Sequence, residues 1–193
     1  RGTMHHDLPH ISHTLGADLR ALRRARGMTL SDTALALGRS VGWLSQVERD
    51  KSDPSIADLR QIAAVFDVPV SILFRHEAAP ASEAGFIVRA GARRPMGSST
   101  EGLVEELLSP DLTDDFEMVH STFLPHSRIK DAVTRPTQEV GYVISGTLEI
   151  EIAGTAHTLI AGDSFRVRGE PFRWANRTPD PAVAIWVIAP PVY

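Results

Sequence analysis

The sequence predicts two small domains, a helical one followed by a β-rich one. Apolar residues recur at helical spacing from Leu15 to Phe74, whereas short β-type runs separated by Gly and Pro fill the chain from Gly85 onward. The stretch between the two patterns, HEAAPASEAG, offers little to bury and is interpreted as a linker. A chain of 193 residues is long enough for two small cores.

The domain boundaries are placed where these patterns change. Residues 1–13 are expected to be a tag remnant and an N-terminal arm, because RGTMHHD is typical of a vector-derived start. The helical domain is predicted over 14–75, the linker over 76–84 and the β-rich domain over 85–193.

Composition excludes several classes of protein. The chain has no cysteine, which rules out disulfides, thiolate zinc sites and thiol nucleophiles. No apolar run approaches the roughly 20 residues needed to cross a bilayer, so we expect a cytoplasmic protein with no membrane partner. The net charge of -4 argues against a broadly basic nucleic-acid coat but allows a local basic face.

Periodicity and cap residues predict five helices in the first half. The first carries Leu15, Leu19 and Leu22 on one face and ends at Gly27. The second helix is expected to begin after a Thr29 or Ser31 cap and to end before a turn at Gly38. Ser40 is expected to cap a third helix that runs to about Arg49, and Ser55, followed three residues later by Asp58, is expected to cap the fourth. The segment VPVSILF is expected to form the fifth, short helix.

Two short helices joined by a tight glycine turn fit the helix-turn-helix arrangement, whose second helix enters the DNA major groove. The stretch RGMTLSDTALALGRSVGWLSQVERDKSDPSIADLRQIAAVFDVPVSILF resembles the lambda-repressor-like (Xre-type) DNA-binding domain, notably in LSQVE, PSIADL and IAAVF. The resemblance covers Leu15 to Phe74 and implies that Arg23 and Glu48 form a structural salt bridge. Thr33 and Arg39 depart from it, where the family has a leucine and a valine or similar residue.

The third helix is expected to face DNA. Leu44 and Val47 lie three residues apart and must face the core, which leaves the other side chains of this helix exposed. The predicted DNA-binding residues are Ser31, Arg39, Ser40, Val41, Gly42, Trp43, Ser45 and Gln46. Gln46 and Ser45 can hydrogen-bond base edges, and Arg39 is an extra phosphate contact. The alternative is that Trp43 and Gln46 belong to an ordinary solvated face.

In the second half, EVGYVISGTLEIEI and IAGDSFRVRGEPFRWANRT resemble the two signatures of the small cupin β-barrel, a double-stranded β-helix. The resemblance covers about Gly85 to Tyr193. It implies that the four positions used by metal-binding cupins, three histidines and a glutamate, are occupied here by Val133, Arg135, Glu139 and Phe172. Because only the glutamate remains, we expect no metal and no other cofactor.

The interior of such a barrel can hold a small molecule. If Arg135 and Glu139 both project toward the former ligand point, the guanidinium supplies the positive charge that a metal would supply. Apolar walls with a few placed polar groups are typical of an effector pocket, and the predicted lining is Arg135, Glu139, Phe172, Trp174 and Trp186. Alternatively, Arg135 and Glu139 form a purely structural pair, or lie on the surface if the alignment slips by one residue.

Together these patterns predict a sequence-specific DNA-binding transcriptional regulator without enzymatic activity, whose metal-free cupin domain senses a small-molecule effector. We expect a homodimer on double-stranded operator DNA, because one short recognition helix reads only a few base pairs. The alternative is a metal-dependent cupin enzyme related to the helix-turn-helix/cupin epoxidase of the phosphonate antibiotic pathway, which requires the missing histidines.

Overall fold

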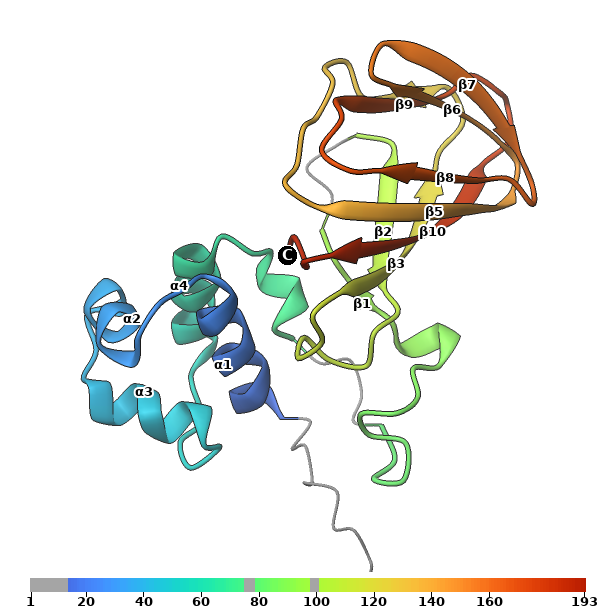
Figure 1. The fold of residues 1–193 in the computed structure, drawn as a ribbon. Helices are drawn as coiled ribbons and strands as arrows, with labels where there is room; N and C mark the ends of the chain where they lie inside the picture. The colour runs from blue at the N-terminus through green and yellow to red at the C-terminus, as the bar shows by residue number, and fades with distance from the viewer. Residues whose placement is uncertain (1–13, 75–78, 98–100) are drawn as a thin grey trace, which may run out of the picture.

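The computed structural model describes residues 14–74, 79–97 and 101–193, and it places a helical unit beside a β unit (Figure 1). The predicted order of a helical domain followed by a β-rich domain is confirmed. The expected tag remnant and the first residues of the expected linker lie outside the described residues. Within the described part, no helix is both long and apolar enough to span a membrane.

Four α-helices form the helical unit: α1 Leu15–Ala25, α2 Leu30–Leu37, α3 Val41–Glu48 and α4 Ile56–Phe66. Each begins after a hydroxyl residue whose side chain accepts a backbone N–H of the first turn, namely Thr14, Thr29, Ser40 and Ser55. Thr29 and Ser55 complete capping boxes with Asp32 and Asp58. The predicted caps at Ser40 and Ser55 are confirmed, and of the alternatives Thr29 and Ser31 the structure selects Thr29.

The expected fifth helix is wrong, because the segment forms only a single 3-10 turn, η1 Val70–Ile72. Pro69 precedes the turn and has no N–H to donate. The Ile72 carbonyl accepts a hydrogen bond from the Arg94 side chain at 3.1 Å. Within the described residues the segment therefore forms one short turn, which contacts β1, rather than the expected helix.

Close approach of α1 and α3 depends on a glycine. A Cβ built at Gly16 would lie 2.6 Å from the carbonyl oxygens of Val47 and Glu48, which is too close for any side chain. The Gly16 N–H also donates to the Asp50 carboxylate at 3.0 Å. Glycine at this position therefore allows the apolar face of α1, with Leu19, to close on α3.

The β unit consists of two antiparallel sheets that face each other (Figure 1). The six-stranded sheet runs β1 Arg94–Pro95, β2 Leu103–Leu107, β3 Glu117–Phe123, β10 Ala182–Ala189, β5 Gln138–Ser145 and β8 Ser164–Val167. The four-stranded sheet runs β4 Ser127–Arg128, β9 Phe172–Asn176, β6 Thr147–Ile152 and β7 Thr155–Ile160. Among the described residues the hydrogen-bond ladders remain two separate sheets, so a closed barrel stays a prediction.

Aromatic side chains fill the space between the sheets. Phe123 on β3 packs edge-on against Trp174 on β9, with ring centroids 4.7 Å apart. Phe165 on β8 makes the same contact with Trp186 on β10, also at 4.7 Å. The Phe165 ring lies over Gly141, where a Cβ would come within 2.2 Å of the ring. These rings provide the apolar walls of the interior.

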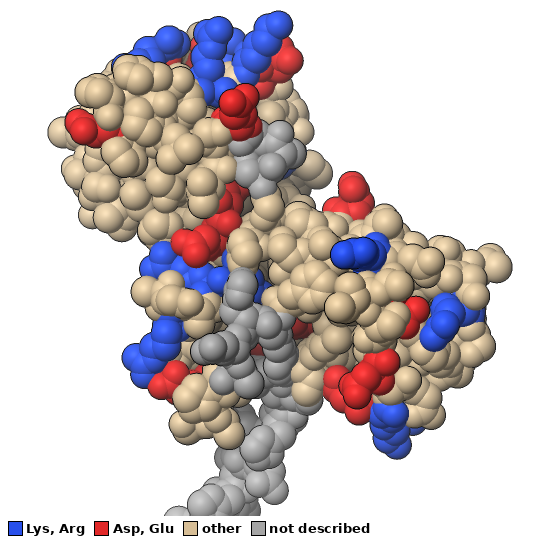
Figure 2. All heavy atoms as spheres, turned by 180° about the vertical axis from the view of Figure 1, so that it is seen from behind, with Lys and Arg blue, Asp and Glu red and all other residues tan. Residues whose placement is uncertain are grey.

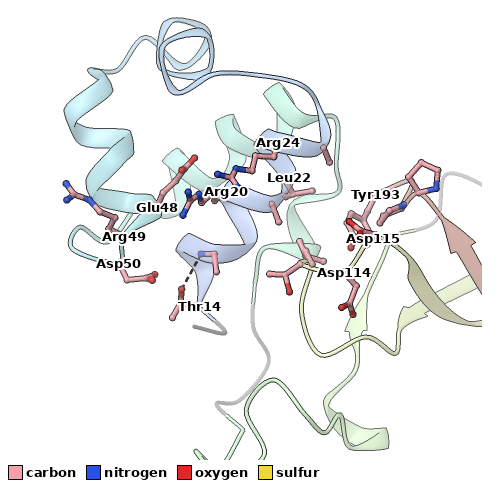
Figure 3. A pocket seen from close by; sticks show the side chains of 17 residues that line it. Thr14, Arg20, Leu22, Arg24, Glu48, Arg49, Asp50, Asp114, Asp115 and Tyr193 are labelled. Carbon is pink, nitrogen blue, oxygen red and sulfur yellow. Dashed lines mark hydrogen bonds between the residues drawn. The ribbon is translucent and has the colours of Figure 1, made fainter. Parts of the chain in front are cut away.

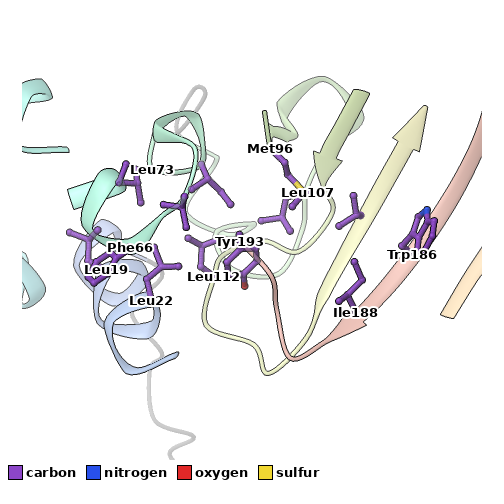
Figure 4. Close-up of a cluster of buried hydrophobic side chains, with 14 of the residues drawn as sticks. Leu19, Leu22, Phe66, Leu73, Met96, Leu107, Leu112, Trp186, Ile188 and Tyr193 are labelled. Carbon is purple, nitrogen blue, oxygen red and sulfur yellow. The ribbon is translucent and has the colours of Figure 1, made fainter. Parts of the chain in front are cut away.

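A buried ion pair joins the two units. Asp18 on α1 is 1% exposed, and its carboxylate contacts the Arg94 guanidinium of β1 at 2.9 Å. The same carboxylate accepts the Leu112 N–H at 3.1 Å. Burial raises the pKa of Asp18 although Arg94 beside it acts in the opposite direction. Around this pair an apolar cluster that includes Leu22, Leu112 and Tyr193 continues from one unit into the other (Figure 4).

Replacing one member of this pair should destabilise the whole chain. Arg94→Met leaves the Asp18 carboxylate buried without its cation, and we expect the free energy of unfolding to fall by about 3–5 kcal/mol in urea titrations. The double variant Asp18→Leu/Arg94→Met should recover most of that loss. Arg89→Met, which removes an exposed Arg from its pair with Glu83, is the matched control and should cause no measurable change. Equal losses for Arg94→Met and the control would show that the buried pair has no special role in stability.

Candidate functional site

The first candidate site is the exposed face of α3. Gly38 ends α2 in the left-handed conformation, with φ of 64°, and so turns the chain into α3. The Ser40 hydroxyl accepts the Trp43 N–H at 3.1 Å and thereby fixes where α3 begins. Leu44 and Val47 are buried as predicted, so the opposite side of α3 faces away from the core.

The predicted DNA-binding residues lie on and beside this face. Exposed among them are Ser31, Arg39, Ser40, Val41, Gly42 and Gln46, whereas Trp43 and Ser45 are half-buried. No atom lies within 4 Å of the position that a Cβ on Gly42 would take, so a surface can approach the backbone closely there. The structure thus places all eight residues on the accessible side of α2, α3 and the turn between them.

Arg39 and Trp43 form a stacked pair at the start of α3. The Arg39 guanidinium lies 4.0 Å from the centroid of the Trp43 ring. Arg39 also lies 3.9 Å from the Asp58 carboxylate at the start of α4. The stack holds a cation and an aromatic face together beside the α3 N-terminus, an arrangement suited to a phosphate and a sugar.

Arg23 and Glu48 are structural residues. The Arg23 Nε and one Nη donate to the two Glu48 carboxylate oxygens at 2.6 and 3.0 Å, and the other Nη donates to the Met28 carbonyl at 2.9 Å. This two-pronged contact ties α1 to the end of α3. On the face of the molecule drawn in Figure 2, Lys and Arg are interspersed with Asp and Glu rather than gathered into one basic coat.

The second candidate site is a cavity of about 200 Å³ between the two sheets. Its lining is mostly apolar and consists of Leu103, Glu105, Ser121, Phe123, Ile129, Val133, Arg135, Phe172, Trp174, Trp186 and Ile188. Of the five residues predicted for an effector pocket, Arg135, Phe172, Trp174 and Trp186 therefore line one cavity. Glu139 lies behind this lining and reaches the cavity through its contact with Arg135.

Arg135 is the cation of the cavity. Its Nη2 lies 3.1 Å from Glu139 Oε1, and its guanidinium is 5.1 Å from the centroid of the Phe172 ring. Glu139 is 1% exposed, and burial raises its pKa, with Arg135 acting in the opposite direction. Arg135 Nε and Trp186 Nε1 are buried and have no hydrogen-bond partner among the described residues. Both unsatisfied donors belong to side chains that line the cavity.

The positions aligned with cupin metal ligands surround the same space. Val133 and Phe172 exchange backbone hydrogen bonds of 2.7 and 2.9 Å, and both line the cavity beside Arg135. Valine and phenylalanine have no donor atom for a metal in their side chains, and a guanidinium repels one. Among the residues described, no three His, Cys, Asp or Glu side chains come together as a metal site. The residues present do not fit a cupin metal centre.

Sequence reasoning missed two further buried carboxylates, Glu105 on β2 and Glu117 on β3. Burial raises the pKa of Glu105, and it raises the pKa of Glu117 to about 7. The signal was available in strand alternation, because Glu117 shares the inward face of β3 with Val119 and Phe123. Three glutamates and one arginine thus share the interior of the β unit.

Comparison with known proteins finds matches to both units. Residues 14–71 match the model of a helix-turn-helix domain, and residues 119–188 match that of a cupin domain. The HTH-type transcriptional regulator PuuR of Escherichia coli K12 is 25% identical over 165 residues, which cover 83% of this chain and 86% of PuuR.

Two solved structures are similar over most of the chain. An HTH_3 family transcriptional regulator from Vibrio cholerae is 24% identical with a TM-score of 0.43, over 92% of this chain and 95% of that one. Hydroxypropylphosphonic acid epoxidase from S. wedmorenis is 17% identical with a TM-score of 0.46, over 90% of this chain and 95% of the epoxidase.

The matched segments coincide with the helical unit and with most of the two-sheet unit described above. The chain therefore joins a helix-turn-helix domain to a cupin domain and is homologous to the HTH-type transcriptional regulator PuuR.

Proposed function

We propose that the chain is a sequence-specific DNA-binding transcription regulator, whose cupin domain binds a small effector and pairs two copies. The observation that carries this proposal is the exposed face of α3, capped by Ser40 and backed by buried Leu44 and Val47, within a segment that matches a helix-turn-helix domain. A recognition helix needs this combination of a rigid core-facing side and a free polar side.

On DNA, the exposed face of α3 would lie in the major groove. Gln46 can donate to and accept from an adenine edge, and Val41 can contact a thymine methyl group. Arg39, held over the Trp43 ring, would contact a phosphate. In this arrangement the phosphate contact sets the position of the helix and Gln46 supplies the specificity.

The effector site would be the cavity between the sheets. Its volume of about 200 Å³ suits a small molecule, and its aromatic walls provide apolar contact. Arg135 and Trp186 have buried N–H groups without partners among the described residues, and these groups would orient the ligand. The unsatisfied donors favour a bound molecule, because a buried donor without a partner costs about 1–3 kcal/mol.

A second copy of the chain would pack on the outer face of the six-stranded sheet. An exposed apolar patch on that face, here called the outer patch, consists of Met118, Val140, Tyr142, Ile144 and Val187. Val187 on β10 stands opposite both Met118 and Val140 in the register, so the patch is continuous across three strands. Two-fold pairing on this patch would present two α3 helices to two half-sites of DNA.

The enzymatic alternative finds less support. The helix-turn-helix/cupin epoxidase type requires histidine ligands, and the corresponding positions carry Val133, Arg135 and Phe172 around one cavity. Arg135 supplies the positive charge that a metal ion would supply, but a guanidinium cannot bind oxygen as a metal ion does. We therefore propose a sensor without catalytic activity.

Removing the Gln46 amide should weaken DNA binding. Gln46→Ala is expected to cost about 1–3 kcal/mol of binding to the preferred site, selected beforehand from random duplexes, because base-edge hydrogen bonds are lost. Fluorescence anisotropy at fixed salt measures this. Gln61→Ala, an exposed glutamine on α4 outside the predicted DNA face, is the matched control and should bind as the unchanged chain does. A Gln46→Ala protein with full affinity would remove Gln46 from the interface.

Removing the cavity cation should abolish the response to the effector while DNA binding persists. Arg135→Ala leaves the buried Glu139 without its cation, so a ligand held by the guanidinium loses its anchor. Gel-shift titrations with a ligand found by mass spectrometry of the purified protein measure this. Arg177→Ala, which breaks an exposed Arg–Glu pair outside the cavity, is the control. Full ligand response in Arg135→Ala would show that the ion pair is purely structural.

A charge in the outer patch should separate the pair of chains. We expect the unchanged protein to scatter light as a dimer at micromolar concentration and Tyr142→Glu to scatter as a monomer, because a carboxylate would be buried at the interface. Ile160→Glu adds the same charge to an exposed apolar position on β7 of the other sheet and should leave the dimer intact. A monomeric unchanged protein would contradict the proposed pairing.

A further inference from the structure

The segment Pro190–Tyr193, which follows β10, contacts both units and is here called the strap. On the side of the β unit, the Val192 N–H donates to Glu117 Oε1 at 3.2 Å. On the side of the helical unit, the Arg26 guanidinium, at the end of α1, donates to the main-chain oxygen of Tyr193. The strap is thus tied to β3 at one residue and to α1 at the next.

The Tyr193 side chain holds the strap by burial. It lies beside Leu112 and near Leu22 of α1 in the cluster between the two units (Figure 4). Its hydroxyl is buried and makes no hydrogen bond among the described residues. Apolar contact of the Tyr193 ring, rather than a hydrogen bond of its hydroxyl, therefore holds the end of the strap in place. Such contact can be lost gradually as the ring moves.

Glu117 is the acid beneath the strap. Its side chain is fully buried, and its Oε2 has no partner among the described residues. The charged and titratable groups that face it are Glu105 on β2, Arg135 and Glu139 at β5, and Tyr193 of the strap. Burial raises the pKa of Glu117 to about 7, so this carboxyl changes charge near neutral pH.

The strap is also adjacent to the cavity along β10. Ile188 stands opposite Glu117 on one side and Glu139 on the other, and it lines the cavity between the sheets. The strap begins two residues later. The end of β10 therefore connects the lining of the cavity, at Ile188, to the strap.

We propose that the strap couples the β unit to α1 through the charge of Glu117: it lies closed while Glu117 is uncharged, and it loosens when Glu117 ionises. This device does not depend on the proposed function, because it concerns only the contact between the two units.

The direction follows from hydration. The Val192 N–H stabilises the charged form of Glu117, but burial destabilises it more, so ionisation favours the arrangement in which water reaches the carboxylate. A cleft of about 890 Å³ lies between α1 and the strap and is lined by Pro190, Pro191 and Tyr193, so solvent lies on the α1 side of the strap. Figure 3 shows Tyr193 and Asp115 facing α1 across this cleft.

Hydrogen exchange on the full chain tests the strap without DNA, so its outcome is separate from that of the proposed function. After correction for intrinsic rates, protection of the Val192 amide should fall about tenfold between pH 6 and pH 8, because the open arrangement gains one ionised carboxylate. The last turn of α1 should lose protection in parallel. In Glu117→Gln both responses should disappear, since the amide cannot ionise.

Two further variants test the role of Glu117 and the coupling to α1 separately. Glu105→Gln removes another buried carboxyl that does not touch the strap and should keep both responses. Arg26→Gln cuts the tie to α1, so the response of Val192 should persist while that of α1 vanishes. A pH response that survives in Glu117→Gln would overturn the role of Glu117. An α1 response that survives in Arg26→Gln would overturn the coupling, and this second test stands even if Glu117→Gln does not fold.

Discussion

The Asp18–Arg94 ion pair determines how the two units of this chain meet. Its two side chains are buried, and a buried charge is tolerated only while its partner is present. Arg94 also donates to the Ile72 carbonyl, so the same guanidinium connects β1 to both α1 and η1. This contact, together with the apolar cluster around it, sets the orientation of α3 relative to the outer patch, and hence the spacing of two α3 helices in the proposed dimer.

The interior of the β unit contains more acidic than basic side chains. Glu117 and Glu139 are buried and Glu105 is half-buried, and Arg135 is the cation that acts on each of them. Burial raises the pKa of all three carboxyls, so the interior responds to any bound molecule or proton that changes the balance. A metal-binding cupin would balance its acidic side chains with the metal ion. Here the Arg135 guanidinium supplies the positive charge, and the Phe172 ring lies against it.

Much of the helical unit could be predicted from the sequence because helix starts are local. The Ser40 and Ser55 caps each act within three residues, and the burial of Leu44 and Val47 follows from their spacing on one helix. The expected fifth helix was wrong: the segment after Pro69 forms only the turn Val70–Ile72, and its Ile72 carbonyl contacts Arg94, more than twenty residues away. In the β unit, the contact of Arg135 with Glu139 was anticipated, whereas Glu105 and Glu117 were overlooked although strand alternation turns them inward.

The sequence by itself determined the order of the two domains, the Ser40 and Ser55 helix caps and the polar face of α3, since these depend on residue type and on neighbours within about one helical turn. Only the tertiary structure decided the contacts between the units. Arg94 and Asp18 lie 76 positions apart, Val192 and Glu117 lie 75 apart, and Arg26 and Tyr193 lie 167 apart. Such pairs leave no periodic signal in one sequence, because their meeting depends on how every intervening element packs.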